Sequence, residues 1–491
     1  MKRLLTVGLF LLLAAGPAAG TILVNPDGSG DYPTIQAALD VISSSLGDTI
    51  LLGDGVFTGP GNSALEAGQN NLYIRSVSGD PSACLIDAQG VRLFSSMPSE
   101  GTNAVISAIS FPNCGGVGAS WARYEFHNCR FTFTTGGAYA FFGSLYFYDC
   151  SFTDCLVPPV GAGEAGGVLC SGCSFIDNHA SFGSPNIGFH DCLFRGNDSG
   201  DDPLFEAHYN QTIYGAGASF HGCRFEDNHA PALIRFDDAD PHDWEPPIQL
   251  TLEDCVFWRN EGTIAELTDV YPNIHGCTFA ENYGAGSDLI RMDCVACFGD
   301  GSEMGNNIFA FRDEGMLLNL APGMTPPTIT CSDFFQVPTG WFVPVNSVFE
   351  DPRFCDLTAG TLTLFDDSPC LPANNSCTVQ MGAEGQGCET VTAVDDTPSA
   401  PAHLAAHPNP FNPKTHLSFS LPAAADVRLA VYALDGRRLA TVLDGQRLAA
   451  GPHALDWEAR DASGHPLASG VYLLALDASG TRESMKLTLL R

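Results

Sequence analysis

The sequence repeats one short pattern seven times between residues 124 and 279. Each copy places a phenylalanine two residues after a cysteine, within an alternation of apolar and polar side chains. Successive cysteines are 19 to 32 residues apart, at Cys129, Cys150, Cys173, Cys192, Cys223, Cys255 and Cys277. A period near twenty with tolerated insertions is typical of a solenoid, in which each repeat forms one coil and contacts its neighbours. The repeat therefore predicts a parallel β-solenoid.

Side-chain parity within the repeat predicts a bend at the cysteine. Apolar residues favour the third residue before the cysteine and the cysteine itself, which breaks the two-residue period of a strand. The residue before each cysteine is always Asn, Asp or Gly, the types that tolerate a left-handed backbone. Each coil should therefore contain two short strands joined by a bend, with Cys and Phe pointing inward. Five copies also have an asparagine five residues after the cysteine, where stacked amides can bond from coil to coil: Asn178, Asn197, Asn228, Asn260 and Asn282.

The ends of the chain carry different signals. Lys2 and Arg3 precede an apolar run over 4–15, and small residues at 18–20 suit cleavage before Thr21, so residues 1–20 predict an export signal. That run is too short for a transmembrane helix, and no other stretch approaches eighteen apolar residues. We expect a secreted protein located at the cell surface, outside the outer membrane. Residues 32–45 have the spacing of an amphipathic helix, which would cap the first coil.

Charge and cysteine content predict two domains. The net charge of the chain is −34, and residues 21–400 contain 48 acidic residues against 11 arginines and no lysine. Residues 401–491 have 9 basic and 8 acidic residues and no cysteine. We expect a solenoid over 21–388, a linker over 389–403 and a second domain over 404–491. Such negative charge excludes nucleic-acid binding driven by counterion release and cationic membrane-surface binding.

The first domain resembles the right-handed parallel β-helix proteins of the pectin-lyase-like superfamily, pectinesterases included. TILVNPDGSGDYPTIQAALD (21–40) and DTILLGDGVFTG (48–59) carry the resemblance, which together with the coils covers 21–388. It implies an all-β fold, a right-handed parallel β-helix with an N-terminal capping helix, and carbohydrate as the ligand. Enzymes of the superfamily use acidic Ca²⁺ ligands with an Arg or Lys base, or Asp residues with an Arg. No run here matches those motifs residue by residue, so the resemblance assigns no catalytic residue.

The second domain predicts a small β-sandwich, because alternating strands are separated by DG and SG turns. Its opening HPNPFNPKT (407–415) and its SGVY segment (469–472) resemble the C-terminal sorting and immunoglobulin-like domains of bacterial surface proteins. That family includes type IX secretion cargo and a flagellar hook-cap-like sandwich. The resemblance implies transit through the outer membrane with the secretion machinery as partner. The alternative is an accessory sandwich without a sorting function.

The cysteines are interpreted in two groups. Those of the repeat should form a buried ladder of free thiols, because stacked side chains point in parallel. The CxxC spacings at 170/173 and 294/297 lack the further ligands of a zinc site, and we interpret them as structural. The best disulfide candidates lie in the loop-rich segment that closes the solenoid, with three possible connectivities: Cys355, Cys370, Cys377 and Cys388.

Two sets of polar residues are candidates for function. The first is a histidine two residues before the cysteine in four coils. His190 and His221 belong to consecutive coils, should lie about one strand spacing apart and are weak catalytic candidates. The alternative is that polar residues are simply expected at a bend.

The second set lies in two acidic insertions on adjacent coils. Their oxygen ligands suit Ca²⁺, which is the cofactor that they imply: Asp198, Asp201, Asp202, Asp237, Asp238 and Asp240. Arg235 is the nearest candidate base, Asp237 and Asp238 are weak catalytic candidates, and Trp244 is positioned to stack on a sugar. The alternative is that these are solvated acidic loops. The sequence favours a scaffold for binding or adhesion to carbohydrate or cell-envelope material, and the alternative function is a polysaccharide lyase or glycoside hydrolase.

Overall fold

The chain forms two compact units that divide after Thr390. The computed structural model describes residues 20–42, 48–66, 71–94, 103–163, 166–183, 186–209, 217–238, 249–284, 288–293, 303–310, 316–322, 324, 327–337, 342–390, 404–421, 424–433, 437–449, 451–478 and 481–490. Within these ranges, no helix is long and apolar enough to cross a membrane.

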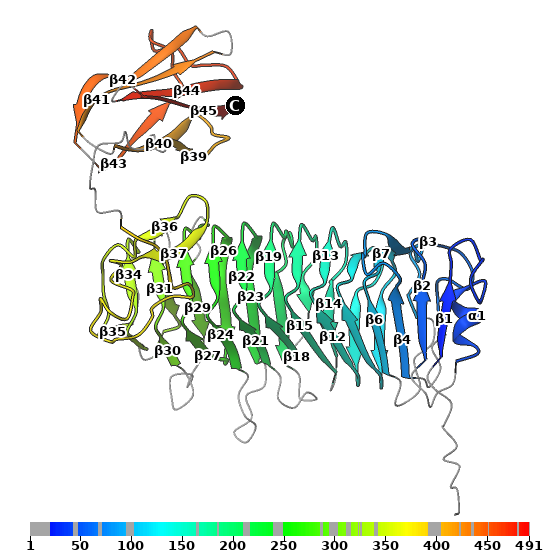
Figure 1. The fold of residues 1–491 in the computed structure, drawn as a ribbon. Helices are drawn as coiled ribbons and strands as arrows, with labels where there is room; N and C mark the ends of the chain where they lie inside the picture. The colour runs from blue at the N-terminus through cyan, green and yellow to red at the C-terminus, as the bar shows by residue number, and fades with distance from the viewer. Residues whose placement is uncertain are drawn as a thin grey trace, which may run out of the picture. The chain divides into compact units, whose positions relative to one another are not determined.

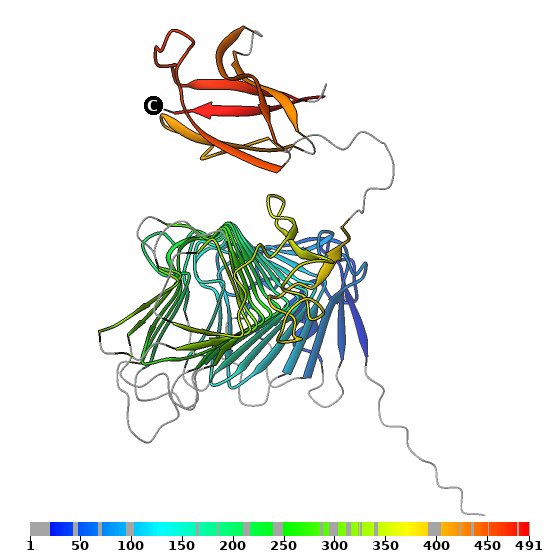
Figure 2. The ribbon, with the colours of Figure 1, turned by 90° about the vertical axis from the view of Figure 1, so that its left-hand side faces the viewer.

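The first unit is a parallel β-solenoid, whose coils follow one another along a single axis (Figures 1 and 2). The first strand of every coil pairs in parallel with its counterparts to form a 14-stranded sheet, here called sheet 1. Its strands, in spatial order, are β1 (Thr21–Val24), β2 (Thr49–Leu52), β4 (Asn71–Ser76), β6 (Asn103–Ser107), β9 (Arg123–His127), β12 (Ser144–Tyr148), β15 (Gly167–Ser171), β18 (Asn186–His190), β21 (Gly217–His221), β24 (Gln249–Glu253), β27 (Tyr271–His275), β30 (Glu303–Gly305), β33 (Thr328–Thr330) and β35 (Val343–Val345).

The second side of the solenoid is a 12-stranded parallel sheet, here called sheet 2. It contains β3 (Gly55–Phe57), β5 (Cys84–Ile86), β7 (Ser110–Cys114), β10 (Arg130–Phe133), β13 (Ser151–Thr153), β16 (Ser174–Ile176), β19 (Leu193–Arg195), β22 (Arg224–Glu226), β25 (Val256–Trp258), β28 (Thr278–Ala280), β31 (Ile308–Ala310) and β34 (Asp333–Phe335).

The third side consists of two sheets. Sheet 3 contains β8 (Val117–Ser120), β11 (Ala138–Phe141) and β14 (Val160–Ala162). Sheet 4 contains β17 (Phe182–Gly183), β20 (Phe205–Tyr209), β23 (His229–Asp238), β26 (Glu261–Thr268), β29 (Ile290–Asp293) and β32 (Leu318–Leu320).

The interior consists of the ladders that the repeat predicted. The repeat phenylalanines stack from coil to coil, for example Phe152 on Phe175 with ring centroids 4.7 Å apart. The seven repeat cysteines are buried and free, which confirms the thiol ladder. The buried asparagines also bond along the axis, since Asn178 Nδ2 donates to Asn197 Oδ1 at 2.9 Å and Asn228 Nδ2 donates to Asn260 Oδ1 at 2.8 Å. Each side-chain amide forms hydrogen bonds with polar groups of the preceding coil, so the amides hold the coils in register.

The bend between sheets 1 and 2 alternates aspartate and glycine from coil to coil. Its left-handed residues are Asp149, Gly172, Asp191, Gly222, Asp254 and Gly276 in successive coils. A Cβ atom built on Gly172 would lie 2.5 Å from Asp149 Oδ1, because that carboxylate leans over the next coil. Each glycine thus makes room for the aspartate before it.

The N-terminal cap contains a helix shorter than predicted. α1 spans Ile35–Leu39 and buries Ile35, Ala38 and Leu39 against the first coil. Thr34 caps its start by accepting from Ala37 N at 3.2 Å. The predicted start at residue 32 is wrong because Tyr32 forms a β-bridge with Val24 instead.

The C-terminal end of the solenoid is closed by residues 348–388, here called the closing segment. Its sheet contains β36 (Phe354–Asp356), β37 (Thr361–Phe365) and β38 (Gln386–Cys388). Leu362, Leu364 and Met381 pack on the outer face of sheet 2, against residues such as Trp258 and Ile308.

Two disulfides tie the closing segment together, and they correct the prediction. Cys355 pairs with Cys388, but Cys377 pairs with Cys331 of the last coil, so none of the three predicted connectivities is right. Cys331 has a left-handed backbone at the bend, which takes its side chain out of the ladder. The prediction that Cys370 forms a disulfide is wrong, because its buried thiol donates to Asp333 Oδ2 at 3.4 Å.

The second unit contains two antiparallel sheets around one core. The smaller contains β39 (Ala405–His407), β40 (Lys414–Leu421) and β43 (Gly451–Glu458). The larger contains β42 (Arg438–Leu448), β41 (Ala425–Tyr432), β44 (Gly470–Ala478) and β45 (Thr481–Leu489), in that order. Phe419, Val427 and Leu474 are among the side chains that both sheets bury between them.

Candidate functional site

The outer face of sheet 1 has an uncharged region four coils wide. Alternate residues of β12, β15, β18 and β21 point outward and are only half-buried. None of the ten whose side chains are described is Asp, Glu, Lys or Arg: Ser144, Tyr146, Tyr148, Gly167, Leu169, Ser171, Gly188, His190, Ser219 and His221. This neutral face stands out in a chain with a net charge of −34.

The predicted histidine row runs along one edge of the neutral face. His190 and His221 are cross-strand partners, and their rings stack with centroids 4.8 Å apart and planes 6° apart. His221 Nδ1 lies 2.8 Å from Glu253 Oε2. Because an ionised carboxylate can only accept, Nδ1 carries the proton and Nε2 faces away from Glu253. The structure thus brings together the two histidines that the sequence singled out.

A groove of about 540 Å³ lies beside these histidines, where the bend meets the closing segment. Its lining includes His190, His221, Asp191, Asp254, Arg224 and Glu384. Burial lowers the pKa of His190, and the neighbouring His221 lowers it further. Burial raises the pKa of Asp254, and the Glu253 carboxylate adds to the rise. The groove therefore favours a neutral imidazole and a carboxyl group that keeps its proton to a higher pH than usual.

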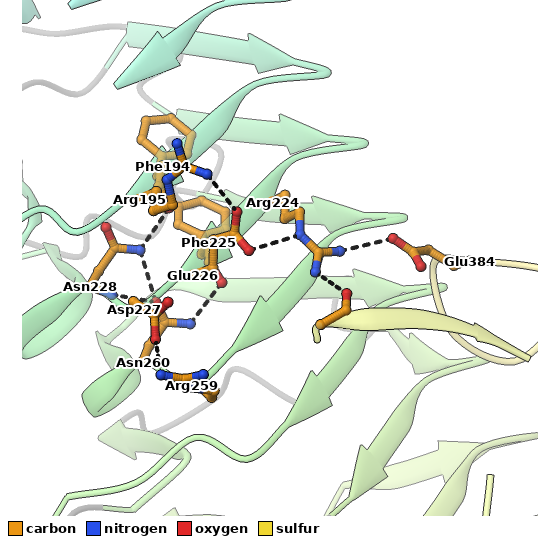
Figure 3. A network of polar contacts seen from close by, with 11 residues as sticks. Phe194, Arg195, Arg224, Phe225, Glu226, Asp227, Asn228, Arg259, Asn260 and Glu384 are labelled. Atoms are coloured by element: carbon orange, nitrogen blue, oxygen red, sulfur yellow. Dashed lines mark hydrogen bonds and ion pairs between the residues drawn. The ribbon is translucent and has the colours of Figure 1, made fainter. Parts of the chain in front are cut away.

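Arg224 anchors the wall of this groove (Figure 3). Its guanidinium bonds to Glu384 at 2.9 Å, to Glu226 at 3.3 Å and to the carbonyl oxygen of Gly360. Since all of its nitrogens face acceptors, Arg224 holds the closing segment in place. This group could not be predicted from the sequence because Arg224 and Glu384 are 160 residues apart.

The candidate Ca²⁺ ligands do not converge. Asp198 forms a backbone β-bridge with His229, the first residue of β23. Asp237 lies eight residues farther along β23, which places it roughly 25 Å from His229 in a fully extended strand. Asp198 Oδ1 instead accepts from Gly200 N at 2.9 Å, and Asp201 and Asp202 are exposed in the same turn.

The remaining candidate ligands give no site. The side chain of Asp238, and Asp240 and Trp244 entirely, lie outside the described residues. Within the described ranges, no three His, Cys, Asp or Glu side chains are grouped so as to hold a metal ion.

Arg235, the candidate base, belongs to a row of ion pairs on the outer face of sheet 4. Its Nη2 lies 2.7 Å from Glu266 Oε2, and Glu266 Oε1 lies 2.9 Å from Arg291 Nη1. Arg235 also lies beside Glu206 across the strands. A guanidinium held in this way is a structural group, and Arg235 is not among the residues that line the groove beside His190 and His221.

Comparison with known proteins identifies the fold. Residues 107–293 match the family described as "Right handed beta helix region". The solenoid is a right-handed β-helix. None of the curated proteins matches the chain.

Several solved structures are similar to the chain. A pectin methylesterase from carrot is 11% identical over 63% of this chain and 89% of its own, with a TM-score of 0.29. ORF18 of Geobacillus virus E2 is 13% identical over 96% and 77%, with a TM-score of 0.30. The tailspike protein of E. coli bacteriophage HK620, in complex with a hexasaccharide, is 12% identical over 92% and 88%, with a TM-score of 0.28. At these TM-scores the likeness carries no functional conclusion.

Proposed function

We propose that the solenoid is a scaffold that binds a neutral, elongated polysaccharide along the outer face of sheet 1. The observation that supports the proposal is the neutral face itself, ten outward residues without Asp, Glu, Lys or Arg on an acidic protein. The rings of Tyr146 and Tyr148 offer apolar surface with a hydroxyl at its edge, which suits sugars. The histidines and serines add hydrogen-bond donors and acceptors.

The spacing and the charge of the solenoid both favour such a ligand. Adjacent coils are about 4.8 Å apart, close to the length of one hexose ring, so a chain along the axis meets the same pattern repeatedly. An anionic polymer would be repelled by the 48 acidic residues of 21–400. A neutral glycan avoids that repulsion.

Binding can be tested by affinity electrophoresis of the purified chain in gels that contain laminarin, galactomannan or polygalacturonate. We expect retardation by a neutral polymer only, and its loss in the Tyr146→Ala/Tyr148→Ala variant. Tyr283→Ala, which removes a tyrosine 48% exposed on another side of the coil, should migrate as the wild type does. Equal retardation of all three proteins would exclude the neutral face as the binding surface.

We also propose that residues 1–20 direct export and that residues 404–491 act as a sorting domain for display at the cell surface. The proposal rests on the resemblances in those two segments. Deleting 404–491 should abolish surface display while export from the cytoplasm continues. Display that survives the deletion would show that this domain has another role.

The histidine groove favours one alternative, a polysaccharide lyase or glycoside hydrolase. Asp254, with its raised pKa, is the candidate acid, and His221 oriented by Glu253 is the candidate base. Release of reducing ends from the neutral polymers, or of unsaturated ends from polygalacturonate, would support this function if Asp254→Asn and His221→Gln abolish it. Absence of such release would contradict the enzymatic alternative and would leave the proposed binding function to its own test.

A further inference from the structure

Four aromatic side chains gather where sheet 3 meets sheet 1. Trp121 follows β8, Phe142 follows β11, and their rings stack with centroids 4.8 Å apart and planes 10° apart. Phe141 meets Phe142 edge to face at 4.5 Å. Tyr139 lies two residues before Phe141, on the same outward face of β11. We call Trp121, Tyr139, Phe141 and Phe142 the aromatic corner.

The aromatic corner exposes much of its apolar surface. Trp121 is 53% exposed, Tyr139 48% and Phe141 38%, whereas the inward residues Ala138 and Ala140 of the same strand are buried. Single exposed apolar residues are ordinary, but a contiguous group of large rings marks a surface that binds something.

The backbone holds two of these rings outward in an unfavourable conformation. Trp121 and Phe142 have φ angles of 58° and 56°. In the seven repeats, the bends between sheets 1 and 2 use Asn, Asp or Gly for this left-handed conformation, as at Asn128 and Asp149. Bulky residues adopt it at a cost, and such strain is concentrated at binding and active sites. Two consecutive coils accept that cost at the same place.

Glycines lie beside Tyr139 and Phe141, and Tyr139 also lines a hollow. The cross-strand neighbours of Tyr139 are Gly118 and Gly161. A Cβ atom on Gly163 would lie 2.8 Å from the Tyr139 hydroxyl and 2.7 Å from the Phe141 ring. The hollow has a volume of about 350 Å³, and its lining is uncharged: Thr135, Gly136, Gly137, Ala138, Tyr139, Val157, Pro158 and Gly161.

We infer that the aromatic corner is a stacking subsite for a neutral pyranose sugar. The C–H face of a pyranose ring packs on an aromatic plane, and a mostly apolar hollow with a few hydroxyl groups, here those of Thr135 and Tyr139, is typical of a small-ligand site. The corner is continuous with the neutral face, because Phe142 is followed by Gly143 and then by β12. The inference rests on the proposed function and names a second contact point for the same glycan.

The fluorescence of Trp121 gives a direct test with the full chain. Cellohexaose, laminarihexaose and mannohexaose serve as probes, and at least one should shift the tryptophan emission on binding. Trp121→Phe keeps a stacking ring, so it should abolish most of the emission change but alter the affinity little. Trp121→Ala should weaken binding about tenfold, the loss expected for one stacked ring. Phe349→Ala, an aromatic residue 60% exposed at the far end of the solenoid, is the control and should bind as the wild type does.

The outcomes separate this inference from the proposed function. If Trp121→Ala binds the hexasaccharides with wild-type affinity while Tyr148→Ala loses binding, the aromatic corner is not a sugar subsite. The proposal that the neutral face binds the glycan then still holds. Failure of the wild type to bind any neutral hexasaccharide or polymer overturns both. If Trp121→Ala instead converts a dimer to a monomer with unchanged sugar affinity, the corner is a self-association surface and the inference is wrong. Trp121→Phe is the control for misfolding, because it keeps an aromatic ring stacked on Phe142.

Discussion

The outer face of sheet 1 in the middle coils of the solenoid differs from the outer face of sheet 2 in the later coils. In β12, β15, β18 and β21, sheet 1 presents tyrosine, serine, glycine, histidine and one leucine to solvent. Sheet 2 presents Val256, Trp258 and Ile308 in its later coils, and the closing segment covers them. The inward residues of both sheets follow one repeat, so the outward residues alone decide which face becomes a surface and which becomes a second core. One face serves stability, and the other is left for a ligand.

The largest effect in this comparison should come from Trp258→Ala. The indole is 5% exposed, and a Cβ atom on Gly360 would lie 2.6 Å from it, so the closing segment packs directly on the ring. Removing a buried tryptophan side chain costs about 3–5 kcal/mol. Urea unfolding of the full chain should show that loss. Leu156→Ala, which shortens a side chain 61% exposed, should change the free energy of unfolding by less than about 0.5 kcal/mol. Similar losses in the two variants would refute the idea of a second core.

The second largest effect concerns Asp333, a carboxyl group buried beneath the closing segment. Its oxygens accept from Cys370 Sγ at 3.4 Å and Glu350 N at 3.3 Å, and burial raises its pKa from 3.8 to about 7. Between these two pKa values the unfolded chain loses a proton that the folded chain keeps. The free energy of unfolding should therefore fall as pH rises from about 4 to about 7, by up to about 4 kcal/mol.

Asp333→Asn removes this titration. The variant should be more stable than the wild type at pH 8 and close to it at pH 4, as measured by urea unfolding at both values. The difference between the two proteins isolates Asp333 from all other titrating groups. Asp201→Asn, in an exposed turn, is the control and should follow the wild type at both pH values. Parallel pH profiles of wild type and Asp333→Asn would show that burial does not hold this proton.

The border between the two sheets should give an intermediate effect. Gly172→Ala places a methyl group 2.5 Å from Asp149 Oδ1 at a residue whose φ is 65°. Gly200 has a similar φ of 67°, and a Cβ atom built there has nothing within 4 Å. Gly200→Ala is therefore destabilised by the left-handed backbone alone. We expect a loss of about 1–2 kcal/mol for Gly200→Ala and a larger loss for Gly172→Ala. Equal losses would mean that the alternating aspartates are not packed over the glycines.

The repeat made most of the solenoid predictable because its constraints are local. Position relative to the cysteine determines whether a residue points inward, and the Asn and Phe ladders follow from stacking equivalent positions. The histidine pair was predicted for the same reason. Arg224 and Glu384 could not be paired from the sequence, because the closing segment folds back over sheet 2 from far along the chain.

Two other features were missed for different physical reasons. Cys331 was left out of the disulfide candidates because its place at a bend is visible only once the last coil is aligned. Trp121 precedes the first copy of the repeated pattern and Phe142 lies between the first and second copies, in turns whose left-handed backbone contradicts the preferences of aromatic residues. Local rules thus fail at the aromatic corner, where we propose that the protein binds its ligand.

The smallest effect on stability should come from Tyr148→Ala, on the neutral face. The ring stacks on His127 with centroids 4.7 Å apart but is only half-buried. Its removal should therefore lower the free energy of unfolding by no more than about 1 kcal/mol. The proportional loss of glycan affinity should be much larger than the proportional loss of stability, since the phenol ring contacts the glycan directly in the proposed mode of binding. Urea unfolding and affinity electrophoresis of the same preparation give both quantities. A large loss of stability with unchanged affinity would reverse the comparison, because sheet 1 would then be the structural face and the ligand would have to bind elsewhere.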